Sequence, residues 1–133
     1  MPDMTSNSTT KSILAVDDEY DIVNLIKQTL EVNGFKVCTF TDALAALEHF
    51  KSNSRYYILV LSDIRMPGIN GYEFVKQVKK IKPQVRIMLM TAFEIENREF
   101  LNVLPDVKVD AFIQKPFSLK ALRNIVQQKL SYN

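Results

Sequence analysis

The stretch LVLSDIRMPGINGYEF, residues 59–74, joins a strand-like run to a helix-like run across a loop. Its apolar residues 59–61 are continuous rather than alternating, which is typical of a strand covered on both faces in a parallel sheet. The run ends in a carboxylate, Asp63, and a loop rich in Pro, Gly and Asn follows before Tyr72. The stretch therefore predicts a βα unit whose buried strand ends in an acid.

The same arrangement recurs along the chain. Short apolar runs predict strands at residues 13–16, 35–40, 57–61 or 62, 85–90 and 109–113. Apolar residues at three- or four-residue spacing predict helices between and after them. Their inward positions are Ile22, Ile26 and Leu30; Ala43, Leu47 and Phe50; Phe74, Val78 and Ile81; and Leu122, Ile125, Val126 and Leu130. A short helix is expected over residues 94–103, before Pro105. Five βα units predict an α/β fold around a parallel sheet.

Length and composition predict one domain. The chain has 133 residues, of which 47% are hydrophobic and 24% charged, as in ordinary globular proteins. A net charge of +2 gives no reason to expect direct binding to nucleic acid or to a membrane surface. No apolar run approaches the ~20 residues that span a bilayer, and the N-terminus lacks a signal-peptide core. We expect a cytoplasmic protein with a flexible tail at residues 1–11 and one domain over residues 12–131.

Polar and charged residues end four of the predicted strands. Asp17 and Asp18 follow the first strand, Asp63 ends the third, Thr91 the fourth and Lys115 the fifth. Each has an ordinary explanation by itself, as a charge at a helix N-terminus, a turn former or a β-branched strand residue. In an open parallel sheet, however, the carboxyl ends of all strands share one edge, where ligands bind. Their convergence at this edge favours a functional site.

Few kinds of chemistry suit a cluster of three acids, a threonine and a lysine. Three crowded carboxylates repel one another, and a hard divalent cation removes that penalty. Mg²⁺ takes oxygen ligands and commonly binds through one or two carboxylates and phosphate oxygens. A lysine and a threonine hydroxyl suit the oxygens of a phosphoryl group, and a carboxylate can accept that group as an aspartyl phosphate. The residues predict a Mg²⁺-dependent phosphoryl site.

Four ordered motifs resemble those of the receiver domain of two-component response regulators. They are Asp17 with Asp18; Asp63 with Met66, Pro67 and Gly71; Thr91 with Ala92; and Lys115 with Pro116 and Phe117. The resemblance covers residues 12–131. It implies a flavodoxin-like (βα)5 fold, with a doubly wound, five-stranded parallel sheet in the strand order 2-1-3-4-5.

The resemblance also implies a role for each site residue. Asp63 would accept a phosphoryl group from a histidine kinase or a histidine phosphotransfer protein. Asp18 and Asp63 would bind Mg²⁺ directly together with the backbone carbonyl of Arg65, and Asp17 would act through a metal-bound water. A cis peptide bond is expected between Lys115 and the proline that follows it.

The remaining roles concern switching and lifetime. Thr91 and Lys115 would contact the phosphoryl oxygens, and Phe112 would be the aromatic residue that turns inward as Thr91 moves. The surface around the fourth helix, the fifth strand and the fifth helix would change, and it would bind an unidentified downstream protein or a second copy of the chain. Arg65 and Phe93 would restrict the hydrolytic water, so we expect slow self-dephosphorylation.

Three other functions stay open on the residues alone. A Mg²⁺-dependent phosphatase with an aspartyl nucleophile would need a second acid shortly after Asp63, where Arg65 stands. A receiver-like adaptor would work without phosphorylation, although the intact set of site residues argues against it. A flavodoxin would need a Ser/Thr/Gly-rich phosphate loop after the first strand, where the chain instead has three acids. The preferred prediction is a phosphoryl-accepting domain with no enzymatic activity beyond self-phosphorylation from small donors and self-dephosphorylation.

Overall fold

Five parallel strands form the sheet of the computed structural model, which describes residues 12–92 and 107–130. The strands are β1 (Ser12–Val16), β2 (Lys36–Phe40), β3 (Tyr57–Asp63), β4 (Arg86–Thr91) and β5 (Ala111–Gln114). Their order is β2-β1-β3-β4-β5, and all neighbours pair in parallel. The predicted doubly wound sheet is therefore confirmed.

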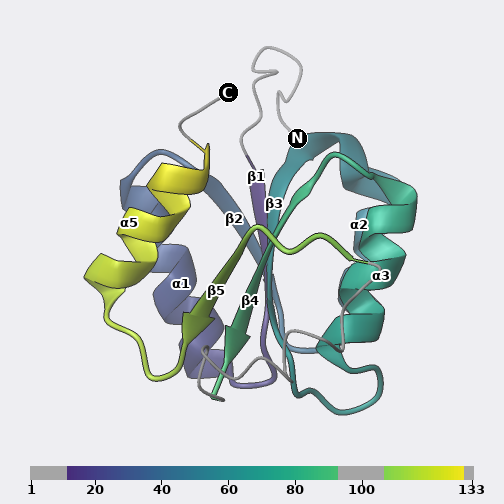
Figure 1. Cartoon of the computed structure of the whole chain (residues 1–133), viewed down its shortest axis with the longest axis horizontal. Helices are drawn as coiled ribbons and strands as arrows, with labels where there is room; N and C mark the ends of the chain where they lie inside the picture. Colours follow the sequence, from purple (N-terminus) through teal and green to yellow (C-terminus); the bar gives the residue numbers. More distant parts are fainter. Residues whose placement is uncertain (1–11, 93–106, 131–133) are drawn as a thin grey trace.

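Helices cover both faces of this sheet (Figure 1). One face carries α1 (Tyr20–Val32) and α5 (Leu119–Leu130), and the other carries α2 (Ala43–Asn53) and α3 (Gly71–Ile81). A short 3-10 turn, Ser54–Tyr56, leads into β3. Within the described ranges, no helix is long and apolar enough to cross a membrane.

The continuous apolar strands follow from burial on two sides. In β1, Leu14 and Val16 join the core cluster under α2 and α3, whereas Ile13 and Ala15 join the cluster under α1 and α5. All four side chains are completely buried. Because successive strand residues point to opposite faces, a strand covered on both sides has no position left for a polar residue until it reaches its end.

Local signals start and stop the helices where the sequence places them. Asp42 caps α2 by accepting a hydrogen bond from the Ala45 amide at 3.1 Å, and Ser118 accepts one from the Ala121 amide at 3.0 Å at the start of α5. After α1, Gly34 takes a positive φ of 96°, which glycine adopts without steric cost. The chain can therefore reverse sharply into β2.

The predicted start of the fifth strand is wrong by two residues. The expected strand at 109–113 is observed at Ala111–Gln114. Asp110 explains the difference, because its backbone amide donates to the Ile87 carbonyl and its carboxylate accepts from the Ile87 amide, both at 2.8 Å. A side chain therefore supplies the hydrogen bond that a strand backbone would otherwise make.

Smaller differences affect other boundaries. The first strand begins at Ser12, the second at Lys36 and the fourth at Arg86, and the third and fourth end at Asp63 and Thr91. The expected tail at residues 1–11 and the expected helix at 94–103 lie outside the described residues.

Replacing Asp110 by Ala should lower the free energy of unfolding by about 1–3 kcal/mol, because the Ile87 amide would lose its acceptor in a partly buried place. The Asp110→Asn variant keeps an acceptor oxygen and should lose clearly less. Urea denaturation of both variants beside the native chain measures the difference. Equal losses in the two variants would contradict the assigned hydrogen bond.

Candidate functional site

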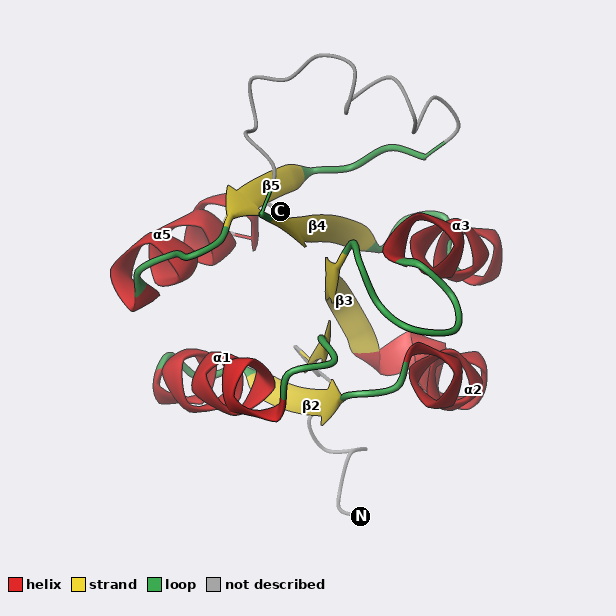
Figure 2. Ribbon diagram, turned by 90° about the horizontal axis from the view of Figure 1, so that it is seen from below, coloured by secondary structure: helices red, strands yellow, loops and turns green. Residues whose placement is uncertain are grey.

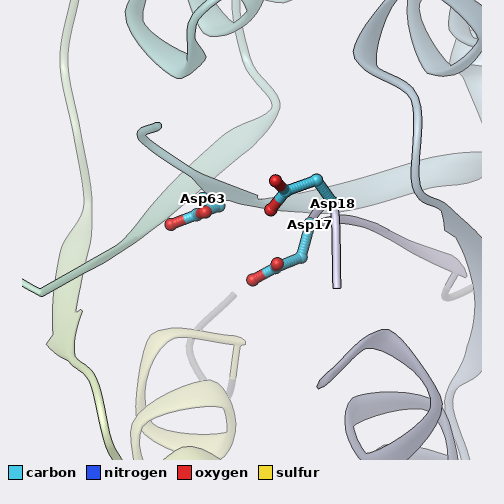
Figure 3. Close-up of side chains that lie close together, drawn as sticks. All are labelled: Asp17, Asp18 and Asp63. Atoms are coloured by element: carbon cyan, nitrogen blue, oxygen red, sulfur yellow. The ribbon is translucent and has the colours of Figure 1, made fainter. Parts of the chain in front are cut away.

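Three carboxylates meet at the carboxyl ends of the central strands. Asp17 and Asp18 directly follow β1, and Asp63 is the last residue of β3. In the β1–β3 register Val16 lies opposite Ser62, and the residue that follows each of them in the chain is an aspartate. One oxygen from each of the three carboxylates lies within 4.8 Å of the others (Figure 3). Parallel pairing is what brings together residues more than forty positions apart.

The three acids differ in exposure. Asp17 is completely buried, and its Oδ1 accepts a hydrogen bond from the Glu19 amide at 2.9 Å. Asp63 is 7% exposed, whereas Asp18 is exposed to solvent. The cluster is therefore buried at Asp17 and open to solvent at Asp18.

Lys115 joins the fifth strand to this cluster. Its Nζ lies 2.6 Å from Asp17 Oδ2 and 3.4 Å from Asp63 Oδ1. A third acid, Glu19, lies 3.7 Å from the same Nζ. The Lys115 amide donates to the Thr91 carbonyl at 2.7 Å, and the peptide bond to Pro116 is cis, as expected. One ammonium group therefore faces several acids.

Glu19 is a contact that sequence reasoning missed. We predicted site roles for the two acids before it and none for Glu19. The signal was present, because three consecutive acids follow β1, but an exposed glutamate at a helix start also has a purely local explanation.

Burial raises the pKa of Asp63 to about 6, with a further increase from the Asp17 charge, although Lys115 opposes both. Burial also raises the pKa of Asp17 against the effect of its hydrogen bond to Lys115. For Lys115, burial acts to lower the pKa, but the hydrogen bond to Asp17 and the nearby carboxylates outweigh it and raise the value. All three pKa values are raised, because burial disfavours the charged form of the two aspartates while their carboxylates favour the charged form of Lys115.

Thr91 and Phe112 lie on the neighbouring strands β4 and β5. Thr91 is buried at the end of β4. Phe112, in β5 opposite Leu89, is partly exposed and packs against the core cluster under α2 and α3. The structure places both residues as the sequence suggests, and their roles as switch residues stay predictions.

The loop after Asp63 carries Arg65 on the surface. Its guanidinium lies near Tyr72, where burial raises the pKa of the phenol and the Arg65 charge opposes that increase. Phe93, which we paired with Arg65 as a residue that tunes lifetime, lies outside the described residues. The fourth helix, expected on the signalling surface, lies there too.

Comparison with known proteins identifies the family. A family model described as response regulator receiver domain matches residues 13–127. The chain belongs to the response regulator receiver domain family. This receiver domain is 33% identical over 110 residues to the response regulator SaeR of Staphylococcus aureus (strain USA300). The aligned residues make up 83% of this chain and 46% of SaeR. The chain thus spans about half the length of the curated relatives it matches.

Solved structures agree with this assignment. A CheY-like response regulator receiver domain protein from Methanospirillum hungatei JF-1 is 30% identical, with a TM-score of 0.76 over 90% of this chain and 92% of that chain. The response regulator TrrA from Thermotoga maritima, solved in complex with Mg(2+)-BeF, is 33% identical, with a TM-score of 0.75 over 90% of this chain and 99% of that chain. The predicted family and fold are confirmed.

The raised pKa of Asp63 predicts a pH-dependent cost in metal-free protein. Unfolded Asp63 ionises near its ordinary pKa of 3.8, whereas the folded protein holds the proton to about pH 6. The free energy of unfolding of the native chain, minus that of the Asp63→Asn variant, should therefore fall as pH rises from about 4 to about 6, and then level off. The expected decrease is on the order of 3 kcal/mol.

Urea denaturation in chelator-treated buffer at a series of pH values measures this difference. The Asp42→Asn variant serves as the matched control, because Asp42 caps α2 and is not among the site residues. A difference between the native chain and Asp63→Asn that stays constant from pH 4 to pH 7 would contradict the raised pKa.

Proposed function

We propose that this receiver domain accepts a phosphoryl group on Asp63 in a Mg²⁺-dependent reaction, with a histidine kinase or a histidine phosphotransfer protein as donor. One observation carries the proposal: the carboxylates of Asp17, Asp18 and Asp63 meet within 4.8 Å beside the ammonium group of Lys115. Membership of the family supports it. The proposed domain extends over residues 12–131 after a tail at 1–11, and its proposed location is the cytoplasm.

Among the three acids, Asp63 is the best candidate for the phosphoryl acceptor. Both oxygens of Asp17 are engaged, since Oδ1 accepts from the Glu19 amide and Oδ2 from Lys115. Asp18 stands on the open side of the cluster, which suits a metal ligand. Asp63 keeps 7% exposure and has Lys115 Nζ 3.4 Å away. An incoming phosphoryl group can therefore reach an Asp63 oxygen and find a cation beside it.

The donor set fits Mg²⁺. Carboxylate oxygens of Asp18 and Asp63 and the backbone carbonyl of Arg65 hold the ion in this proposal, and Asp17 acts through a water. These are the hard oxygen ligands that Mg²⁺ prefers. Bound Mg²⁺ offsets the negative charge of the carboxylates and of the phosphoryl oxygens. The Mg(2+)-BeF complex of the related TrrA supports this choice of metal.

The residues of the chain supply nucleophile, charge and hydrogen bonds. An oxygen of ionised Asp63 forms a bond to phosphorus while the P–N bond of the donor phosphohistidine breaks, and the electron pair of that bond returns to the imidazole. Lys115 then exchanges part of its contact with Asp17 for a phosphoryl oxygen. The Thr91 hydroxyl donates to another phosphoryl oxygen, since it ends the strand beside β3.

Signalling follows from the movement of Thr91. A phosphoryl group adds about two negative charges at neutral pH and several acceptor oxygens. Drawing Thr91 toward these oxygens changes the space beside β5, into which the Phe112 ring turns. The surface of the fourth helix, β5 and α5 then binds a downstream protein, or a second copy of the chain in a homodimer.

Mass spectrometry after incubation with acetyl phosphate tests the proposed function. The native chain should gain one phosphoryl group with Mg²⁺ and none with a chelator, and the Asp63→Asn variant should gain none. The Asp42→Asn variant controls for the loss of a carboxylate elsewhere. Addition that persists in Asp63→Asn would place the acceptor at another residue, and no addition to the native chain would favour a phosphorylation-independent adaptor.

Phosphoryl lifetime tests the roles of Arg65 and Phe93. If these side chains keep the hydrolytic water away, phospho-Asp63 should decay several-fold more slowly in the native chain than in an Arg65→Ala, Phe93→Ala double variant. The decay is followed by mass spectrometry after the donor is removed. Arg55→Ala removes an exposed arginine outside the site and should leave the lifetime unchanged. Equal decay in the native chain and the double variant would show that neither side chain slows hydrolysis.

A further inference from the structure

The first residue of α3 lies directly against the backbone of Asp63. Gly71 is buried, and a Cβ atom added there would stand 2.2 Å from the Asp63 carbonyl oxygen and 2.7 Å from Ile64 Cα. Both are backbone atoms, so no side-chain rotation can relieve the overlap. Any other amino acid at position 71 would displace part of the main chain.

Hydrogen bonds hold both sides of this contact. The Gly71 amide donates to the Ile64 carbonyl at 2.8 Å, and the Ile64 amide donates to the Met90 carbonyl at 3.2 Å. The Ser62 hydroxyl donates to the Asp63 carbonyl oxygen at 2.8 Å. The Asp63–Ile64 peptide is therefore fixed between β4 and the start of α3, with no spare room for a methyl group.

We propose that Gly71 is a positioning residue for the Asp63 site. Because Gly71 has no side chain, α3 can begin in contact with the Asp63–Ile64 peptide. That contact sets the backbone from which the Asp63 carboxylate and the Arg65 carbonyl project. The claim that Gly71 positions the Asp63 backbone rests on the contact itself. The claim that this affects Mg²⁺ binding and phosphoryl transfer rests on the proposed function.

A methyl group at position 71 can be relieved in two ways. If the Asp63–Ile64 peptide moves, the Asp63 carboxylate moves relative to Asp17 and to Lys115, which is now 3.4 Å away. If the start of α3 moves instead, it pulls the loop at 64–70, which includes the Arg65 carbonyl. Either movement alters the proposed oxygen ligands, and Mg²⁺ tolerates little departure from octahedral geometry.

Two other glycines provide matched controls. Gly68 lies in the same loop with a φ of 86°, and Gly34 follows α1 with a φ of 96°; a Cβ on either meets no atom within 4 Å. Alanine at Gly68 strains the loop without the overlap, and alanine at Gly34 strains the backbone far from the site. Both substitutions cost stability through positive φ, so they separate a general loss of stability from a misplaced site.

Calorimetric titration with Mg²⁺ and crystallography of the metal-free proteins test the inference. Gly71→Ala should weaken Mg²⁺ binding by about tenfold or more, because small misplacements of reacting groups are costly. Its crystal structure should show a longer distance between Asp63 Oδ1 and Lys115 Nζ, or a displaced Arg65 carbonyl. Gly68→Ala and Gly34→Ala should bind Mg²⁺ within about threefold of the native affinity. The melting temperature of each variant, measured in parallel, gives its loss of stability.

Several outcomes would overturn the inference. Gly71→Ala could lose stability while its Mg²⁺ affinity falls no further than that of Gly34→Ala, which would give Gly71 a structural role alone. An equal loss in Gly68→Ala would assign the effect to loop strain. Crystals of Gly71→Ala with an unmoved Asp63 carboxylate and Arg65 carbonyl would refute the claim that Gly71 positions the Asp63 backbone.

The test also separates this inference from the proposed function. If the native chain binds no Mg²⁺ and accepts no phosphoryl group, the proposed function fails, while the Gly71→Ala crystal structure still decides the positioning role. If Gly71→Ala does not fold, Ser62→Ala takes its place. That variant removes the hydroxyl that holds the Asp63 carbonyl without adding an atom, and it should weaken Mg²⁺ binding by about tenfold. An unchanged affinity in Ser62→Ala would then count against control of the site by this peptide.

Discussion

The site depends on the mutual repulsion among three carboxylates, and the Lys115 ammonium group offsets part of their negative charge. Lys115 and Asp17 are separated by 98 positions, yet their side chains meet at 2.6 Å. Because β3 and β4 lie between β1 and β5 in the sheet, this ion pair passes over two strands to connect the fifth strand with the first. A ligand that changes the charge of the acids would therefore change the electrostatic environment of Lys115.

The rest of the fold makes that arrangement rigid. Two hydrophobic clusters hold the sheet from opposite faces, and β3 contributes to both, with Val60 on one side and Leu59 and Leu61 on the other. Such a scaffold presents its polar residues at the strand ends, where loops meet solvent. Figure 2 looks onto this edge, from which the loops leave toward the helices on both faces. Asp63 combines a buried backbone with a reachable carboxylate because it stands at this boundary.

Sequence reasoning succeeded where one interaction dominates locally. Continuous apolar runs identify strands covered on two faces, and Asp42 and Ser118 mark helix starts by the hydrogen bonds that they accept. The convergence of Asp17, Asp63 and Lys115 could be anticipated too, because the carboxyl ends of parallel strands must share an edge. The start of β5 could not be anticipated. There the Asp110 carboxylate, and not a backbone carbonyl, accepts the hydrogen bond of the Ile87 amide, and the pattern of apolar residues carries no sign of this.

The sequence by itself determined the kinds of element, their order along the chain and the polar residues at the strand ends, because burial and capping act over a few residues. Only the tertiary structure decided which acids share Lys115 and how closely α3 approaches Asp63. Along the sequence Glu19 has an ordinary role at the start of α1, and only the fold brings the Lys115 ammonium group, which follows β5, to 3.7 Å from its carboxylate. Gly71 looks like a loop residue until the Asp63 carbonyl is found where its side chain would be. Such contacts depend on ångström-scale distances between separate elements, which no spacing along the chain encodes.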